Sequence, residues 1–370
     1  MDRDSIKAID PLAHTLVGFA LAKSGLEKRS GYAAAALVIG ANLPDVDGLT
    51  YFVSADLGFL FRRGWTHGIA AIVLLPLLLA GALVLIDRIR SARGRARFST
   101  LLPLSLLAVA THPTLDWLNS YGMRWLMPFD GKWFYGDAVF IVDPWIWLTL
   151  GGAVFLATSR GRVRTLAWTA LSAVSGYLVW NGASGLIAAK LSFFAGLAVL
   201  TVLRLGRLPR TERGIELVNQ SAVALVALYV FSLLGISAAA HRFTLAELER
   251  RGVEVSSLMV GPRPITPFVK DVVAETPESY RYGVLTLWPW KTLHLSKDAI
   301  PRPQPGPIVK RALEQTEVRG FASWARFPWA EAIEEPDRYR VILRDARYVR
   351  RGDDDGFGAA VVSLPKLIDP

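Results

Sequence analysis

Hydrophobic residues in this 370-residue chain are concentrated in long runs rather than spread evenly. Most of the longer runs reach or approach the roughly 20 residues that an α-helix needs to cross a bilayer; they cover residues 68–86, 139–157, 165–179, 184–203 and 218–240. Shorter runs could be tilted spans, half-embedded helices or helices buried by their neighbours; they cover residues 11–21, 32–43 and 101–110. The pattern predicts a mainly α membrane protein, a polytopic helical bundle of six to eight spans.

Residues 241–370 follow a different pattern, in which apolar and polar positions alternate as they do in strands. The predicted strands cover residues 280–290, 338–349 and 358–364, and a short helix is expected at 309–317. The polar segment RGDDDG (351–356) lacks the ligand spacing of an EF-hand loop and is expected to be a turn that could close a hairpin. We therefore expect two domains: a helical transmembrane domain over 1–240 and a small soluble α+β domain over 241–370.

Composition and charge support a membrane protein. Hydrophobic residues make up 52% of the chain, too many for an ordinary soluble domain, and the absence of cysteine excludes disulfides and thiolate ligands. The formal charge of +10 could suggest nucleic acid as a partner, but much of it lies in short loops, at 22–31, 87–98, 159–164 and 204–214. Basic loops mark the cytoplasmic side. When these loops are placed in the cytoplasm and the apolar runs cross the membrane between them, the C-terminal domain lies outside the cytoplasm. Because this topology accounts for the basic charge, we expect no nucleic-acid partner.

Polar clusters interrupt the apolar pattern at four places in the first 120 residues: DPLAH (10–14), PDVD (44–47), RRGWTH (62–67) and THPTLD (111–116). In this topology, each cluster falls at the outer end of a membrane helix. A single such residue is most often a cap, but ionisable groups at membrane depth are costly and tend to be functional. Together they predict one metal site with six candidate ligands: His14, Asp45, Asp47, His67, His112 and Asp116.

The side-chain chemistry narrows the choice of metal. Imidazole and carboxylate without thiolate suit zinc first, with manganese or iron as alternatives, and a carboxylate-rich site can hold one or two ions. His241 and His294 have no carboxylate at metal-binding spacing and are expected to be structural.

Local sequence signals predict how these clusters are held. Asp10 before a proline is expected to cap the first helix, and Thr66 to cap the helix that carries the next histidine. Pro113 disfavours continuing its helix, so a kink or a fresh start is expected there. Asp45 and Asp47 would point to the same side of an extended turn.

The segment after the last cluster, residues 123–145, interleaves aromatic residues with charged ones. One interpretation is an aromatic belt at headgroup depth. The other is a substrate platform, in which Arg124 and Lys132 attract phosphate. Asp143 could be a further ligand or could orient a ligating histidine, and Asp137 and Asp130 are weaker candidates. Asp10 is a further candidate for contact with a ligand or with the substrate.

Four segments, in the same order, also resemble the motifs of the YdjM-like family of membrane-bound metal-dependent hydrolases: DPLAHTLVGFALA, GANLPDVDGL, RRGWTHGI and THPTLDWLNSYG. The resemblance covers about residues 10–150. It implies a protein of the bacterial inner (plasma) membrane with a histidine and aspartate metal site, assigned as a hydrolase. It supplies no role for residues 241–370.

Two functions are consistent with these patterns. The first is a hydrolase that acts through a metal-activated water on a phosphoester or ester bond of a membrane lipid or lipid-linked substrate, with Asp45 or Asp116 as the base. The alternative is a metal-stabilised scaffold or transporter without hydrolytic activity. A transport pathway would need polar residues along the later helices, where Asn181, Lys190 and Asn219 are isolated.

Overall fold

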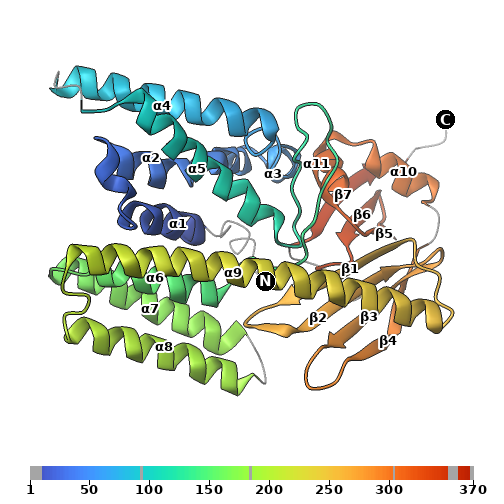
Figure 1. Ribbon diagram of the computed structural model, residues 1–370. Coiled ribbons are helices and arrows are strands. Elements are labelled where there is room, and N and C mark those ends of the chain that lie inside the picture. Colours follow the sequence, from blue (N-terminus) through green and yellow to red (C-terminus); the bar gives the residue numbers. More distant parts are fainter. Residues whose placement is uncertain (1–10, 92–94, 183–185, 303–304, 349–356, 367–370) are drawn as a thin grey trace.

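The computed structural model describes residues 11–91, 95–182, 186–302, 305–348 and 357–366. Helices form one part of the molecule and two β-sheets form the other (Figure 1). The first half of the helical part contains α1 (Pro11–Lys23), η2 (Leu26–Arg29), α2 (Ala33–Gly40), η3 (Leu43–Phe52), α3 (Ala55–Phe61), α4 (Ile69–Ser91) and α5 (Phe98–Trp117). The second half contains α6 (Pro144–Thr158), α7 (Arg162–Gly182), α8 (Ile187–Leu205) and α9 (Glu212–Arg250).

Helix α1 joins the two halves of the helical part. On one side it packs with α2, α4 and α5 around a core that includes Leu21, Leu37 and Leu104. On the other side it packs with α6 and α9 around a core that includes Leu16 and Leu150. The histidine in its first turn is thereby held between the two halves.

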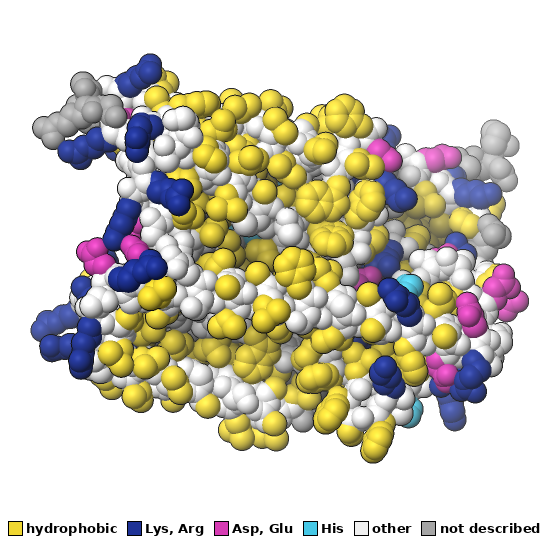
Figure 2. Space-filling view, in the orientation of Figure 1, with side chains coloured by type: hydrophobic (Ala, Val, Ile, Leu, Met, Phe, Trp, Pro, Cys, Tyr) yellow, Lys and Arg dark blue, Asp and Glu magenta, His cyan; other side chains and the backbone are white. Residues whose placement is uncertain are grey.

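Four helices are long and apolar enough to cross a membrane, by length and composition: Ile69–Arg90, Phe98–Trp117, Ile187–Leu205 and Glu212–Arg250. Many of their large apolar side chains, such as Leu78 and Phe231, point away from the rest of the molecule, as expected for lipid contact. Figure 2 shows apolar side chains over the middle of the helical part and Lys and Arg gathered at the end farthest from the sheets. A span count of six to eight stays a prediction.

Two of the predicted apolar runs begin or end at other residues than the helices that contain them. Helix α6 begins only at Pro144, because Asp143 caps it by accepting from the backbone N–H groups of Trp145 and Ile146. Helix α9 continues past residue 240 to Arg250, because its last turns bury Ala240 and Leu248 against the first sheet.

The C-terminal part contains two antiparallel sheets. The first has the order β1 (Ser257–Arg263), β2 (Thr266–Glu275), β3 (Ser279–Thr286) and β4 (Thr292–Pro301). The second has the order β5 (Pro328–Glu334), β6 (Arg338–Asp345) and β7 (Ala359–Pro365), with α10 (Pro307–Leu313), η4 (Thr316–Val318) and α11 (Arg319–Trp324) beside it. The predicted strands correspond to β3, β6 and β7 and the predicted helix to α10, while the predicted RGDDDG turn lies outside the described residues.

Contacts between residues far apart in the sequence hold the second sheet against one end of the helices. Asp56 accepts hydrogen bonds from the backbone N–H groups of Gly320 (2.6 Å) and Phe321 (3.2 Å) at the start of α11. Arg347 donates to the carbonyl oxygen of Ser120 (2.6 Å). The rings of Phe59, Tyr121 and Trp324 pack together between these contacts. The sheets therefore cover the end of the bundle where α5 finishes (Figure 1).

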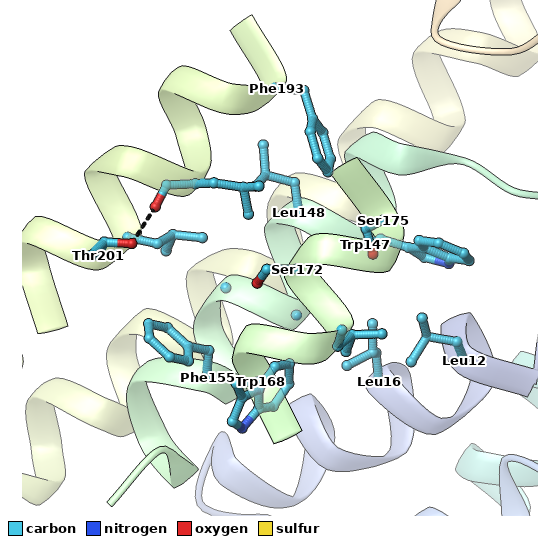
Figure 3. A pocket seen from close by; sticks show the side chains of 15 residues that line it. Leu12, Leu16, Trp147, Leu148, Phe155, Trp168, Ser172, Ser175, Phe193 and Thr201 are labelled. Atoms are coloured by element: carbon cyan, nitrogen blue, oxygen red, sulfur yellow. Dashed lines mark hydrogen bonds between the residues drawn. The ribbon is translucent and has the colours of Figure 1, made fainter. Parts of the chain in front are cut away.

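One cavity inside the bundle, of about 100 Å³, lies between α1, α6, α7 and α8. Figure 3 shows its apolar wall, with Leu12, Leu16, Phe155 and Trp168, and the hydroxyls of Ser172, Ser175 and Thr201. Thr201 donates to the backbone carbonyl of Leu197, which the same view marks. None of the described residues lining it is ionisable, so the candidate chemistry lies elsewhere.

Candidate metal centre

The four polar clusters meet at the end of the bundle that faces the sheets. Helix α5 carries His112 and Asp116 one turn apart, η3 carries Asp45, and His67 lies in the turn before α4. One ligand atom from each of these four residues lies within 4.8 Å of all the others. Three of the four side chains are buried, and Asp45 keeps 18% exposure. Segments separated by up to about 70 residues thus form a single group that could hold a metal ion.

Outer acceptors fix the orientation of both histidine rings. Nδ1 of His112 lies 2.6 Å from the backbone carbonyl oxygen of Ala41. Nδ1 of His67 lies 3.1 Å from Oδ2 of Asp47. Because a carbonyl and a carboxylate only accept, we assign the proton of each neutral ring to Nδ1. Both Nε2 atoms then present lone pairs to the centre, the arrangement found at histidines that bind metals.

The distances between the inward atoms fit a small divalent ion. The two Nε2 atoms are 3.2 Å apart. Oδ2 of Asp116 lies 3.3 Å from Nε2 of His67 and 3.7 Å from Nε2 of His112. Oδ1 of Asp45 lies 3.2 Å from Nε2 of His112 and 3.8 Å from Nε2 of His67. Ligands about 2.0–2.1 Å from a tetrahedral zinc are separated by roughly 3.3 Å, so the spacing suits such an ion.

Two buried arginines, which sequence reasoning did not identify, balance the carboxylates. Arg62 donates to Oδ1 of Asp45 (2.6 Å) and also pairs with Asp47. Arg63 donates to Oδ1 of Asp116 (2.8 Å) and to Oδ1 of Asn119 (2.9 Å). Three carboxylates against two guanidinium groups leave one negative charge in excess when the histidines are neutral. The signal in the sequence was the Arg-Arg pair inside RRGWTH itself.

Asp47 lies outside the central group and holds it in place. Its Oδ2 accepts from the backbone N–H of Arg63 and from the hydroxyl of Thr66, both at 2.9 Å, and lies beside Nδ1 of His67. Burial would raise the pKa of the Asp47 carboxyl, but the positive charge of Arg62 and the hydrogen bond from His67 lower it. Asp47 is therefore an ionised partner that orients the ring of His67.

His14 also reaches the centre from outside. Its ring stacks on that of His112 with centroids 3.7 Å apart, and its Nε2 lies 3.4 Å from Oδ1 of Asp116. Oδ1 is the Asp116 oxygen that faces Arg63, whereas Oδ2 faces the two other histidines. The geometry therefore places His14 behind Asp116 rather than within the group of four.

The other sequence candidates have different surroundings. Arg124 donates to the backbone carbonyls of Leu60 (2.6 Å) and Arg62 (3.0 Å), which shapes the turn that carries Arg62. Lys132 is exposed beside the ring of Phe134. Asp143 caps α6 and accepts from the hydroxyl of Tyr229 at 3.0 Å. Asp10 lies outside the described residues.

Three local expectations are corrected. Thr66 does not cap a helix: α4 begins at Ile69, and the Thr66 hydroxyl donates to Asp47 instead. Asp45 and Asp47 lie in the 3₁₀ helix η3, not in an extended turn, and Arg62 brings their carboxylates together.

Helix α5 also continues through Pro113 instead of restarting there, and a kink at this proline stays a prediction. Hydroxyls of neighbouring residues bond to backbone carbonyls around this proline, Thr111 to Ala108 (2.7 Å) and Thr114 to Ala110 (2.8 Å). Such bonds help a membrane helix to tolerate a proline. The continuous helix keeps His112 and Asp116 on one face.

A small cavity of about 30 Å³ adjoins the centre. His14 and Asp116 line one part of it, and apolar side chains of residues 139–141 line another. Nδ1 of His14 is buried without a hydrogen-bond partner in the described part of the chain. The centre therefore has a polar wall that meets an apolar surface between α1, α5 and the segment before α6.

Comparison with known proteins gives a family match for the first part of the helical region. Residues 9–188 match the family model of the YdjM inner membrane protein. The chain is also similar to the "Uncharacterized protein YfhP" of Bacillus subtilis (strain 168), with 28% identity over 126 residues; this match spans 34% of the chain and 37% of that protein. No solved structure gives a significant match. Residues 9–188, which carry all six candidate ligands, thus belong to the YdjM inner membrane protein family.

Proposed function

We propose that this chain is a membrane-embedded metal-dependent hydrolase, with the ion held by His67, His112 and Asp116 and with Asp45 beside it. The observation that carries the proposal is the 3.2 Å separation of two Nε2 atoms whose rings are fixed by acceptors on the far side. Two neutral nitrogens with facing lone pairs repel at this distance. A cation between them would replace repulsion by coordination.

The ligand set favours one ion, with zinc the first expectation and manganese or iron as alternatives. The four inward atoms surround one point, while Asp47 is fully engaged with arginine, threonine and histidine donors. A bound divalent ion would lower the pKa of a water and stabilise negative charge that develops on the substrate.

Asp116 and Asp45 have different roles in this proposal, one in metal binding and the other in proton transfer. Asp116 is buried and faces both histidines, so it serves as a ligand. Asp45 is the most accessible of the four, so we assign it as the base that takes the proton of the attacking water. Arg62 and Arg63 leave an excess of one negative charge at the centre, which a divalent ion would convert to one positive charge. That charge favours an anionic group, such as a phosphoester, over a neutral one.

The surroundings favour a lipid or lipid-linked substrate. The sheets cover the end of the bundle, and the cavity at the centre is bordered by apolar residues 139–141. A substrate that arrives sideways from the bilayer would meet this surface directly. The basic side chains gather at the opposite end of the helices (Figure 2), which supports a site at the outer membrane surface. A reporter active only in the cytoplasm and fused after residue 370 should therefore stay silent.

A metal-stabilised scaffold is the second candidate. Four protein ligands in a tetrahedral set are typical of structural zinc sites, and the group of four has this composition. Transport has less support, since Asn181 and Asn219 each donate to a carbonyl of their own helix and Lys190 to the carbonyl of Trp180.

Hydrolysis by the purified protein in lipid vesicles separates the two candidates. We would measure release of phosphate from lipid phosphomonoesters, of alcohol from phosphodiesters and of fatty acid from acyl esters, with zinc present and after chelation. The Asp45→Asn variant should keep its metal and lose turnover, while Asp130→Asn, at an exposed position, should match the wild type. A wild-type protein that binds metal, turns over no phosphoester or ester lipid and unfolds on chelation would establish the scaffold instead.

A further inference from the structure

Three exposed aromatic side chains lie together at one edge of the first sheet. Phe268, Trp288 and Trp290 are 47%, 69% and 78% exposed. Phe268 lies near the start of β2, and the two tryptophans lie in the turn between β3 and β4. The backbone N–H of Leu287 donates to the carbonyl of Phe268 (2.7 Å). The start of β2, which carries Phe268, and the turn between β3 and β4 are therefore neighbours. Large apolar surface of this kind on a protein marks an interaction site.

The same edge of the sheet packs against helices α6, α7 and α8 of the bundle. Ile265, in the turn between β1 and β2, is buried with Val179 of α7 and Phe193 of α8. Its carbonyl oxygen accepts from Nε1 of Trp145 at the start of α6 (2.9 Å). Ile265 has a φ of 71°, which is costly for a β-branched residue. Packing against the helices holds the turn in this conformation.

A shared cavity shows that Phe268 lies level with the first turns of α6 and α8. The cavity has a volume of about 740 Å³ and is lined by Trp145 in the first turn of α6, Ile187 at the start of α8, Tyr229 of α9, and Phe268. Helices that span a bilayer end near the interface between hydrocarbon and water, where tryptophan is enriched. Phe268 therefore lies at the level of this interface, and the bond from Leu287 to Phe268 joins the turn that carries Trp288 and Trp290 to it.

The opposite edge of the sheet has a different character. The turn between β2 and β3 contains the exposed Pro277 and Glu278, and Arg302 pairs with Glu275 nearby (2.9 Å). Antiparallel pairing of β2 with β3 places these residues at the far end of the strands from Phe268. One sheet thus has an aromatic end beside the first turns of α6 and α8 and a charged end at the other end of its strands.

We propose that the aromatic edge formed by Phe268, Trp288 and Trp290 inserts into the interfacial layer of the lipid bilayer. The C-terminal region then has a lipid-binding surface of its own, in addition to its contacts with the helices. The apolar rings lie among the upper acyl chains and the indole N–H groups reach the headgroups. This inference requires neither a bound metal nor hydrolysis.

The absence of cysteine from the chain allows a direct test. Trp290→Cys and Glu278→Cys, each labelled with an environment-sensitive fluorophore, would be reconstituted into phosphatidylcholine vesicles that contain nitroxide-labelled lipids. The label at position 290 should show blue-shifted emission and quenching several-fold stronger than at position 278. Lys291→Cys, at an exposed neighbouring position, would replace Trp290→Cys if that variant eluted as misfolded protein.

Equal quenching at positions 290 and 278 would overturn the proposal. A blue shift at 290 that depends on protein concentration and comes without quenching would also overturn it, because it would show that the patch contacts a second copy of the chain rather than lipid.

Discussion

Two buried clusters of charged side chains differ in how completely their polar atoms are bonded. In the C-terminal region, both carboxylate oxygens of Asp345 accept hydrogen bonds, Oδ1 from the backbone N–H of Arg347 (2.9 Å) and Oδ2 from that of Arg326 (2.6 Å). At the metal centre, Oδ2 of Asp116 accepts no hydrogen bond within the described residues, and two Nε2 atoms face each other. Buried polar groups are normally bonded, so the cluster around Asp116, in which bonding is incomplete, is the one that could hold an ion.

The Asp345 cluster should therefore contribute to stability and the metal centre to binding. Arg347 illustrates the first role, since it also donates to the carbonyls of Ser120 and Trp324 and so joins the second sheet to the helices. Arg62 and Arg63 illustrate the second, since they offset charge around a group in which Oδ2 of Asp116 accepts no hydrogen bond within the described residues. The following variants test this division, beginning with the largest expected effect.

Asp345→Ala should be strongly destabilising, because it leaves the buried guanidinium of Arg347 without its ion-pair partner. Breaking a buried pair in this way costs about 3–5 kcal/mol. Denaturant unfolding in detergent would measure the loss. The metal content per folded molecule should match the wild type, and a loss of metal from protein that remains folded would contradict the division.

Lys270 should make the folded state more stable as the pH rises from about 8 to about 10.4. It is buried in β2, where burial lowers the pKa of its ammonium to about 8 despite the nearby Asp137. In that window the unfolded chain holds a proton that the folded chain has released, so the free energy of unfolding increases, by up to about 3 kcal/mol. Unfolding curves across this window should show the increase in the wild type and lack it in Lys270→Met. Parallel profiles would show that Lys270 titrates normally.

Arg63→Lys should weaken metal binding by about 10- to 100-fold, the usual effect of losing an outer contact to a ligand. A lysine cannot reproduce the forked bonds of Arg63 to Asp116 and Asn119. Competition with a chromophoric chelator would measure the affinity. Arg242→Lys, at an exposed position on α9, is the matched control, and equal affinities for the two variants would contradict the role given to Arg63.

Asp143→Ala should have the smallest effect, a destabilisation of about 1 kcal/mol from the loss of a helix cap. Asp143 bonds to backbone N–H groups of α6 and to Tyr229, so its removal should leave metal affinity unchanged. A tenfold loss of affinity with normal stability would instead assign it to the metal centre, as the sequence allowed.

The sequence predicted the candidate ligands of the site better than the residues that pair with them. His67, His112, Asp45 and Asp116 could be proposed from residue type and predicted depth, since each follows or precedes an apolar run. Arg62 and Arg63 could not, because arginines beside a membrane helix are ordinarily solvated or mark topology. Only the fold shows that both guanidinium groups point inward to carboxylates from other segments.

Strands β3, β6 and β7 of the C-terminal region were predictable from local alternation, but the other four described strands and the docking of the sheets were not. Asp56 bonds to the backbone of Gly320, and Ser120 to Arg347, across more than 200 residues with no local signal. Hydropathy also did not predict where α9 ends, because its last turns bury their apolar side chains against β-strands. Long-range packing decided these features.

Elemental analysis of detergent-purified protein, prepared without chelator, tests the central claim most directly. The wild type should contain one divalent ion per chain. His67→Ala and His112→Ala should contain none while eluting as folded protein. His241→Ala and His294→Ala, which change exposed histidines, should keep the ion. A wild-type protein free of metal, or equal metal content in all four variants, would contradict the account.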